Sequence, residues 1–397
     1  MATITFYPVG TGDTSQIVLD DGRRILMDFR HLTAGEDEGT KVIDLAARLN
    51  EELKEAGRDY FDVVIFTHAD LDHIRNSHEF FELPGAGPQT YTGNGRIKVH
   101  EFWVPAAMLF EEVKQKQRGN DYEVLRRELR QRFRDGKGIK VFSRPQALLD
   151  WMEKDGLSYE DREHLFEYAG RVVNCFQLDR DGIEFFTHSP FSDSESTAQN
   201  VYRNEDSLIF QIRFASEEPI NLMAFGDSIY DAIDDIVLLS KRNGNTDRLK
   251  WDLLSIPHHC SYECLNQTKE DPERDGDRIT LPTAHIRELL KVHAAPNPHL
   301  VSSSNPIRED EEAHNRTLPP HIQAKRGYRE TVGLHAPFWV TMEHPSIDEP
   351  QPLVFEVGQY GLSKLPAAKK STASHHGISA AQEAAVYANP RSGASDE

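Results

Sequence analysis

The chain has 397 residues, of which 38% are hydrophobic and 28% charged, so it can bury a large core in one big domain or two smaller ones. Its net charge of −20 argues against a protein that holds long nucleic acid over its whole surface, because phosphate contacts supply most of that affinity. A nucleic acid substrate would need a local basic patch. No apolar run approaches the roughly 20 residues that cross a bilayer, which predicts no membrane span.

The cysteines and the N-terminus bear on the cellular compartment. Cys175, Cys260 and Cys264 cannot make a disulfide framework, and the first residues lack the basic and then apolar pattern of a secretory signal. We therefore expect a reducing, cytoplasmic setting. Cys260 and Cys264 lie beside two histidines, so a small zinc site is an alternative to two ordinary thiols.

Taken in order, the chain begins with strands joined by tight turns. Residues 4–9 alternate as a strand does, and Gly10 to Asp13 form a turn that lacks the helix and lysine of a phosphate-binding loop. Residues 15–20 and 24–29 predict a hairpin. The second strand of this hairpin ends in Asp28.

The next strand runs into a dense group of ionisable side chains. The apolar run Val63–Phe66 is followed by His68, Asp70, Asp72 and His73. A buried strand explains the apolar run, but no fold requires two imidazoles and two carboxylates in six residues. Neutral imidazole and carboxylate are ligands of zinc and its neighbours, so this turn predicts a metal site.

A segment at about residues 107–170 has a helical pattern and is interpreted as an insertion that could form a lid. Helices are predicted over residues 122–134, 146–154 and 158–169. The stretch Arg126–Arg134 is rich in arginine. It is either a solvated helix face or a patch that meets an anionic substrate, including nucleic acid.

The other elements mix apolar strands with amphipathic helices. Further strands are predicted over residues 100–105, 172–178, 183–188, 207–214, 220–226, 252–257, 299–304, 338–343 and 353–357. Further helices are predicted over residues 42–56, 230–241, 284–293 and 319–327. Residues 366–397 are rich in Ala, Ser and Lys without an apolar period, which predicts a disordered tail after a single domain over residues 1–365.

Ligand-type residues follow apolar strands at four places. These are Asp28, the turn His68–His73, Asp227 and the pair His258-His259. One such strand end would be a coincidence, but four indicate a site assembled at one edge of a sheet. Loops commonly project functional groups from a rigid scaffold in this way.

These motifs resemble those of a known family. The spacing His68-x-Asp70-x-Asp72-His73 resembles the signature of the metallo-β-lactamase superfamily, and the other three strand ends stand where its further motifs would. The resemblance covers about residues 1–360. It implies an α/β fold, a four-layer αββα sandwich of two packed sheets with helices outside, here carrying the helical insertion.

The resemblance is strongest to the nuclease-like domain attached to bacterial DNA-uptake channels and to related stand-alone hydrolases. Those proteins have Asp in place of the second His of the motif, as Asp70 stands here. They also have a middle element that reads Asn204-Glu205-Asp206-Ser207 in this chain.

The resemblance further implies a site for two divalent metal ions, Zn or Mn. His68 and Asp70 would hold one ion, Asp72 and His73 would hold the other, and Asp227 would bridge them. A site with many oxygen ligands favours Mn over Zn.

Other ligands are left open. Either His259 or His258 would complete the second metal position, and the third-motif ligand would be His188 or Asn204. Three residues would lie in the outer shell or near the substrate: Asp28, which would orient a ligand histidine, Asn204 and Ser207. Cys260 stands where the family usually has Gly.

The function implied by the resemblance is metal-dependent hydrolysis by a metal-activated hydroxide, with Asp72, Asp227 and His259 at its centre. We expect a phosphodiester substrate, as for a phosphodiesterase or nuclease. The same motif also serves lactams, thioesters and lactones, so a small-molecule esterase or lactonase is the alternative, and the charge of −20 fits it better. A non-catalytic scaffold or regulatory subunit with a protein partner is a third hypothesis.

Overall fold

The computed structural model describes residues 1–33, 41–93, 95–111, 119–191, 207–271 and 278–367. Residues 1–367 form one compact unit. The predicted tail falls outside the described residues except for residues 366 and 367. In the described part of the chain, no helix is long and apolar enough to cross a membrane.

The larger sheet has nine strands among the described residues, in the order β15-β14-β1-β2-β3-β4-β5-β6-β7. Strands β3 to β7 run parallel, while the strands from β15 to β3 pair antiparallel. Their bounds are β1 Ala2–Phe6, β2 Ser15–Val18, β3 Arg24–Met27, β4 Tyr60–Ile65, β5 Lys98–Pro105, β6 Ile139–Phe142, β7 Phe166–Glu167, β14 Leu353–Gly358 and β15 Gly361–Lys364.

The second sheet has six described strands in the order β13-β12-β11-β10-β9-β8. Strands β10 to β13 are parallel, and β9 is antiparallel to both of its neighbours. Their bounds are β8 Ile183–Ser189, β9 Ile209–Phe214, β10 Ile220–Ala224, β11 Trp251–Ser255, β12 Ala294–Ser302 and β13 Phe338–Val340.

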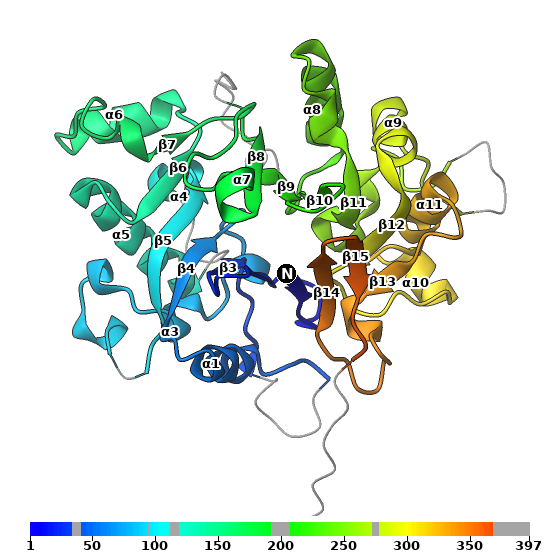
Figure 1. Cartoon of the computed structure of the whole chain (residues 1–397), viewed down its shortest axis with the longest axis horizontal. Helices are drawn as coiled ribbons and strands as arrows, with labels where there is room; N and C mark the ends of the chain where they lie inside the picture. Colours follow the sequence, from blue (N-terminus) through cyan, green and yellow to red (C-terminus); the bar gives the residue numbers. More distant parts are fainter. Residues whose placement is uncertain (34–40, 94, 112–118, 192–206, 272–277, 368–397) are drawn as a thin grey trace, which may run out of the picture. The chain divides into compact units, whose positions relative to one another are not determined.

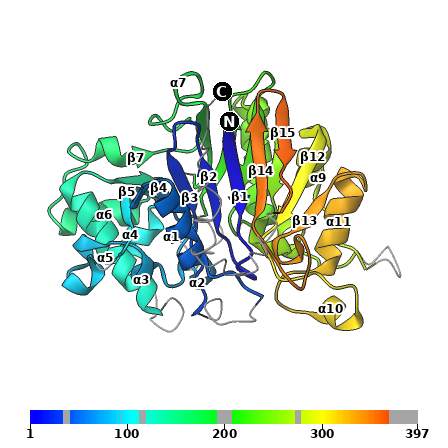
Figure 2. The same ribbon diagram turned by 60° about the horizontal axis from the view of Figure 1, so that its bottom comes forward.

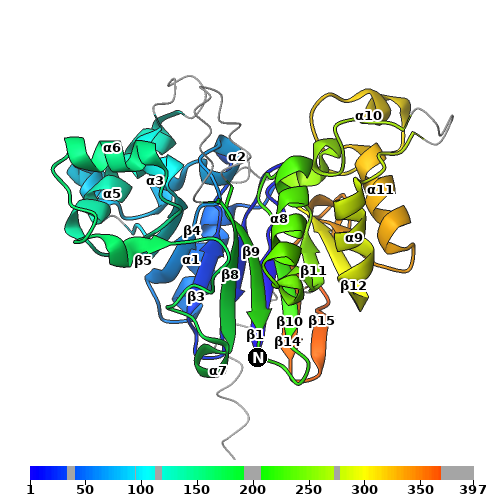
Figure 3. The ribbon, with the colours of Figure 1, turned by 90° about the horizontal axis from the view of Figure 1, so that it is seen from above.

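Helices cover the outer faces of both sheets (Figures 1 and 3). The first sheet is covered by α1, α4, α5 and α6, and the second by α8, α9 and α11. The described α-helices are α1 Leu45–Glu55, α2 Leu71–Ile74, α3 Ser77–Phe80, α4 Ala107–Phe110, α5 Gly119–Asp135, α6 Gln146–Lys154, α7 Leu178–Asp181, α8 Tyr230–Arg242, α9 Ala284–Val292, α10 Glu311–Asn315 and α11 Ile322–Val332.

The core follows from the alternation of side chains along the strands. In β4, Val63 and Ile65 face the core between the sheets, whereas Val64 faces the helices. Trp103 of β5 fills the space between the sheets, with its ring centroid 6.2 Å from that of Phe210 on β9. The fold is therefore an αββα sandwich, as the resemblance implies.

The segment of residues 107–170 contains two strands in addition to its helices. Strands β6 and β7 extend the large sheet beyond β5, so this segment is part of the sandwich. The helix predicted over residues 158–169 is wrong, because a 3-10 turn at Glu163–Leu165 leads directly into β7. Such short strands owe their conformation to pairing with a neighbour more than to local propensity.

The strand predicted over residues 172–178 is also wrong. Val172 makes only an isolated bridge with Phe186, and α7 begins at Leu178. The other predicted helices and strands recur with shifts of a few residues at their ends, as expected for element boundaries.

Candidate metal centre

The ends of β4, β10 and β11 meet at one edge of the sandwich. Strand β4 ends at Ile65 and leads into the short helix α2, which carries Asp72 and His73. Strand β10 leads to Asp227, and β11 leads to His258 and His259. Side chains from both sheets therefore converge here.

His73 lies at the centre of this convergence and is fully buried. Its Nδ1 lies 2.8 Å from Oδ2 of Asp28, and its Nε2 lies 3.1 Å from Oδ1 of Asp227. Asp28 is fixed in turn by Thr67, whose backbone N and Oγ1 both donate to it, at 2.8 and 2.7 Å. Asp28 thus orients the imidazole of His73.

His259 brings the second sheet to the same place. Its Nδ1 donates to the backbone oxygen of Ser303 at 3.0 Å, which leaves Nε2 facing the cluster. That Nε2 lies 3.2 Å from Oδ2 of Asp72 and 3.5 Å from Oδ1 of Asp227. Of the two candidate histidines, His259 is therefore the one held in place by the backbone.

Asp13 is a member of the cluster that sequence reasoning missed. Its Oδ2 lies 3.9 Å from Nδ1 of His259 and 4.0 Å from Nε2 of His73. A hydrogen bond from its backbone N to the backbone oxygen of Asp72, at 3.2 Å, ties the turn after β1 to α2. Asp13 lies in the connection between β1 and β2, where a single carboxylate gives no distinctive sequence signal.

Two overlapping groups of side chains could each hold a metal ion. One group is Asp13, His73, Asp227 and His259; the other is His68, Asp72, His73 and Asp227. In each group the ligand atoms lie within 4.8 Å of one another. His73 and Asp227 belong to both groups, so they occupy the shared centre.

The remaining predicted residues lie at the margin of the cluster or outside it. Nε2 of His68 lies 3.9 Å from Oδ2 of Asp70, and Nε2 of His258 lies 3.8 Å from Oδ2 of Asp227. Ser207 is buried beside the site, where its Cβ is 3.5 Å from the position that a Cβ on Gly226 would take. Asn204 falls outside the described residues.

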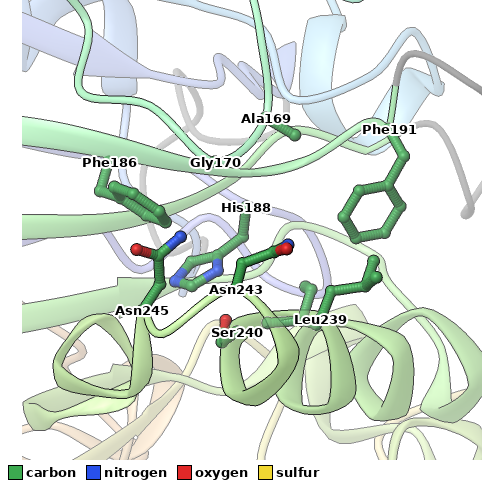
Figure 4. Close-up of a pocket in the computed structure, with 10 residues that line it drawn as sticks. Ala169, Gly170, Phe186, His188, Phe191, Leu239, Ser240, Asn243 and Asn245 are labelled. Atoms are coloured by element: carbon green, nitrogen blue, oxygen red, sulfur yellow. The ribbon is translucent and has the colours of Figure 1, made fainter.

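His188 lies away from the metal cluster. Its Nε2 is 2.9 Å from the backbone oxygen of Arg248. The ring lines a pocket of about 260 Å³ between β8 and α8, together with Phe186, Ser240 and Asn245 (Figure 4). Burial lowers the pKa of His188 to about 4, so its imidazole is neutral at neutral pH.

The cluster has a strong internal field. Burial acts to lower the pKa values of His73 and His259, but the nearby carboxylates raise them by more. The pKa of His73 therefore lies well above its usual value, and that of His259 rises to about 9. Burial likewise would raise the pKa of Asp227, yet the charges of His73 and His259 hold it well below its usual range. The carboxylates therefore stabilise positive charge at this place.

The donor set fits divalent metal ions. Nε2 of His68 is buried without a hydrogen-bond partner, 3.6 Å from Oδ2 of Asp227. Metal–ligand bonds of about 2.0–2.2 Å place two donors of one ion roughly 3–3.5 Å apart, close to the separations around Asp227. Burial and the charge of His73 lower the pKa of His68, so its imidazole is neutral, as a ligand must be.

The turn after β11 is strained. Three consecutive residues, His258, His259 and Cys260, have left-handed backbone angles, with φ of 46°, 53° and 67°. Such angles cost about 1 kcal/mol or more for each residue other than glycine. Cys260 thus adopts a conformation that glycine reaches most easily, although its side chain is fully buried.

The arginines of α5 are engaged within the protein. Arg126 pairs with Glu123 at 2.9 Å, Arg132 pairs with Glu128 at 2.7 Å, and Arg130 donates to the backbone oxygen of Leu109 at 2.6 Å. The first two pairs lie within α5, and the bond from Arg130 attaches α5 to α4.

Comparisons with known proteins give little further information. No protein-family model matches the sequence, and no curated protein matches it. Among solved structures, the chain is similar to a diphosphatase from the PhnP family, with 13% identity over 89% of this chain and 97% of that chain and a TM-score of 0.32. It is also similar to unliganded yeast PDE1, with 11% identity over 89% of this chain and 99% of that chain and a TM-score of 0.40.

Proposed function

We propose that this chain is a metal-dependent hydrolase of the metallo-β-lactamase superfamily that cleaves a phosphodiester. The observation that carries the proposal is the pair of overlapping ligand groups centred on His73 and Asp227. The two oxygens of Asp227 allow this carboxylate to bridge two close divalent ions, while Nε2 of His73 would bind one of them. A structural site would need only one closed set of four ligands.

The residues have separate tasks in this proposal. Bound Zn or Mn ions would lower the pKa of water and neutralise charge on the attacked group. Asp28 holds His73 in the tautomer that leaves Nε2 free as a ligand, and the backbone oxygen of Ser303 does the same for His259. Asp227 supplies one oxygen toward His73 and the other toward His68.

The choice of a phosphodiester rests on the resemblance to nuclease-like members of the superfamily. A small-molecule ester or lactone is the second candidate, and the net charge of −20 favours it over a nucleic acid polymer. The three cysteines are all unpaired, which supports our proposal of a cytoplasmic enzyme. A catalytically inactive scaffold with a protein partner is the remaining alternative.

Metal analysis and a substrate panel test the proposal. We expect at least one tightly bound transition metal per chain, and Mn-dependent turnover of bis-p-nitrophenyl phosphate that disappears in Asp72→Ala. Asp252→Asn is the matched control, because Asp252 is a partly buried carboxylate in β11 that bonds to Asn221 at 2.8 Å, outside both ligand groups.

Each outcome of this panel has a defined meaning. If the protein hydrolysed only lactones, it would be a small-molecule lactonase, the second candidate, and not a phosphodiesterase. A protein that binds no transition metal and gains no activity from Mn or Zn would be a scaffold.

A further inference from the structure

Arg30 occupies an unusual place beside the metal cluster. It follows β3, and its backbone N donates to Oγ1 of Thr14 at 2.9 Å. Nη1 of Arg30 donates to the backbone oxygen of Val9. Gly12 lies close to both elements: if it carried a Cβ, that atom would lie 2.7 Å from Nε of Arg30 and 2.7 Å from the backbone oxygen of Asp72. The arginine is thus packed between the turn after β1 and α2.

The charge of Arg30 is confined next to two residues of the cluster. Burial lowers its pKa, and the nearby Arg75 does the same, while the carboxylates of Asp72 and Asp13 raise it. An arginine remains a cation under such shifts, because its ordinary pKa lies far above neutrality. A fixed positive charge therefore borders the carboxylates.

One end of this guanidinium is available to a ligand. Nε of Arg30 is buried without a partner, and Nη1 is used by Val9. Nη2 has no hydrogen bond within the described structure, yet it is absent from the buried unpartnered atoms, so it is accessible to solvent. An accessible donor on a clamped arginine loses little conformational entropy when it binds an anion.

Asn305 borders the same turn from the other sheet. The position that a Cβ would take on Gly10 is 2.9 Å from Nη1 of Arg30 and 3.5 Å from Oδ1 of Asn305. The backbone N of Asn305 donates to Oγ1 of Thr11 at 3.3 Å. Its side-chain amide also has no partner within the described structure and is accessible, so it offers a second polar group.

A cavity of about 340 Å³ begins at Asn305 and extends along α10. It is lined by two cations, Arg308 and Arg316, and by two acids, Asp310 and Glu312. Helices α2 and α10 lie at the same end of the two sheets (Figures 2 and 3). The volume is in the range of small-molecule sites, and the mixed charges suit a polar ligand more than a polyanion.

We infer that Arg30 and Asn305 form an anion-binding subsite of the candidate metal centre, and that the cavity beside α10 takes one arm of a small, polar phosphodiester. This inference rests on the proposed function, which it narrows. Arg30 is the positioning residue: its accessible N–H group donates to a phosphate oxygen while the phosphorus lies over the cluster.

Ligand binding tests the subsite without relying on turnover. Dimethyl phosphate and a thymidine dinucleotide are titrated calorimetrically into the Mn-loaded protein and its Arg30→Gln and Arg30→Lys variants. Metal content and melting temperature are measured alongside. We expect Arg30→Gln to weaken both ligands about tenfold or more, and Arg30→Lys to weaken them less. Arg75→Gln is the matched control, because Arg75 is an exposed cation near Arg30. The affinity of this variant for both ligands should change less than about twofold.

The cavity is tested by a second variant and a longer ligand. Arg316→Gln should weaken the dinucleotide and leave dimethyl phosphate unchanged, because only the dinucleotide has an arm long enough to enter the cavity. A single-stranded oligonucleotide should bind no tighter than the dinucleotide.

Three results would overturn the inference. One is equal affinity of the wild type and Arg30→Gln, and another is equal weakening by Arg30→Gln and Arg75→Gln. The third is a lower metal content in Arg30→Gln, which would mean that Arg30 balances the charges of Asp72 and Asp13 and does not bind the ligand. If Arg30-dependent binding is found but no diester is cleaved, the proposed function fails and the subsite stands.

Discussion

Asp28 accepts a hydrogen bond from Nδ1 of His73 at 2.8 Å and is itself held by two donors from Thr67. Asp28 has a left-handed backbone, with φ of 56°, which is uncommon for a residue other than glycine. The chain therefore maintains a strained conformation at the residue that fixes the tautomer of the central histidine. Strain of this kind is concentrated at functional sites.

Replacement of this carboxylate should weaken metal binding without unfolding the protein. Asp28→Asn keeps the shape of the side chain but removes the negative charge that orients His73. We expect about a 10–100-fold loss in metal affinity, the usual effect of removing such an outer-shell partner. Calorimetric titration with Zn and Mn measures it, with Asp252→Asn as a control whose affinity should not change. Unaltered affinity in Asp28→Asn would contradict the assigned role.

The two ligand groups should be separable by mutation. Asp13 belongs to one group and His68 to the other, while His73 and Asp227 belong to both. Asp13→Ala and His68→Ala should each weaken a different metal-binding step, whereas Asp227→Ala should weaken both. His188→Gln is the control, because His188 lies in the pocket beside α8 and should leave both steps unchanged. If Asp13→Ala and His68→Ala gave identical metal titrations, the protein would not have two separate metal-binding positions.

The metal-free protein should lose stability as the solution becomes basic. The folded-state pKa of His259 is about 9, against an ordinary value of 6.5, so its protonated form stabilises the fold fully below about pH 6.5. That contribution is lost as pH rises toward 9, and it is on the order of 3 kcal/mol. Urea unfolding of chelator-treated protein across this range measures it. The slope should be smaller in His259→Asn, and an unchanged slope would disprove the assignment.

Metal binding should show the opposite dependence on pH. Metal ions bind the neutral imidazoles, so a proton on His259 or His73 competes with the metal. Affinity should therefore rise with pH up to about pH 9, the pKa of His259 in the folded protein, and proton release should accompany binding below that pH. Calorimetry in buffers of different ionisation enthalpy counts the released protons, and no release would indicate that the histidines are neutral before metal binds.

The arginines of α5 should affect stability and leave catalysis unchanged. Arg130 donates to the backbone oxygen of Leu109, and its guanidinium lies 5.1 Å from the ring centroid of Trp151. Arg130→Gln should cost about 1–2 kcal/mol of unfolding free energy. Arg127 is exposed, and Arg127→Gln should change it by less than about 0.5 kcal/mol. A loss of turnover in either variant without loss of stability would instead support the interpretation that this arginine-rich stretch contacts an anionic substrate.

The sequence predicted the metal motif because its signal is local. Packing alone gives no reason for four ligand-type residues to stand directly after an apolar strand, and Asp227 and His259 recur at equivalent strand ends. Asp13 was missed because a single carboxylate in a turn after a strand is common. The hydrogen bond between its backbone and that of Asp72, which the sequence does not reveal, brings it to the cluster.

The position of His188 depends on the face of a strand, which the sequence left open. Ile183 and Phe185 belong to the core between the sheets, so alternation places Phe186 and His188 on the face toward α8. A shift of one residue would have reversed these faces. Strands β6 and β7 were missed for a related reason, since runs of four and two residues carry too little pattern to distinguish pairing from coil.

The contribution of both sheets to each ligand group has a consequence for the assembly of the protein. His73 and Asp72 follow a strand of the first sheet, whereas Asp227 and His259 follow strands of the second. Neither the N-terminal nor the C-terminal half of the chain contains a complete group. If the halves were produced as separate fragments, neither should bind metal tightly alone, and recovery of tight metal binding on mixing would report that the two halves had reassembled.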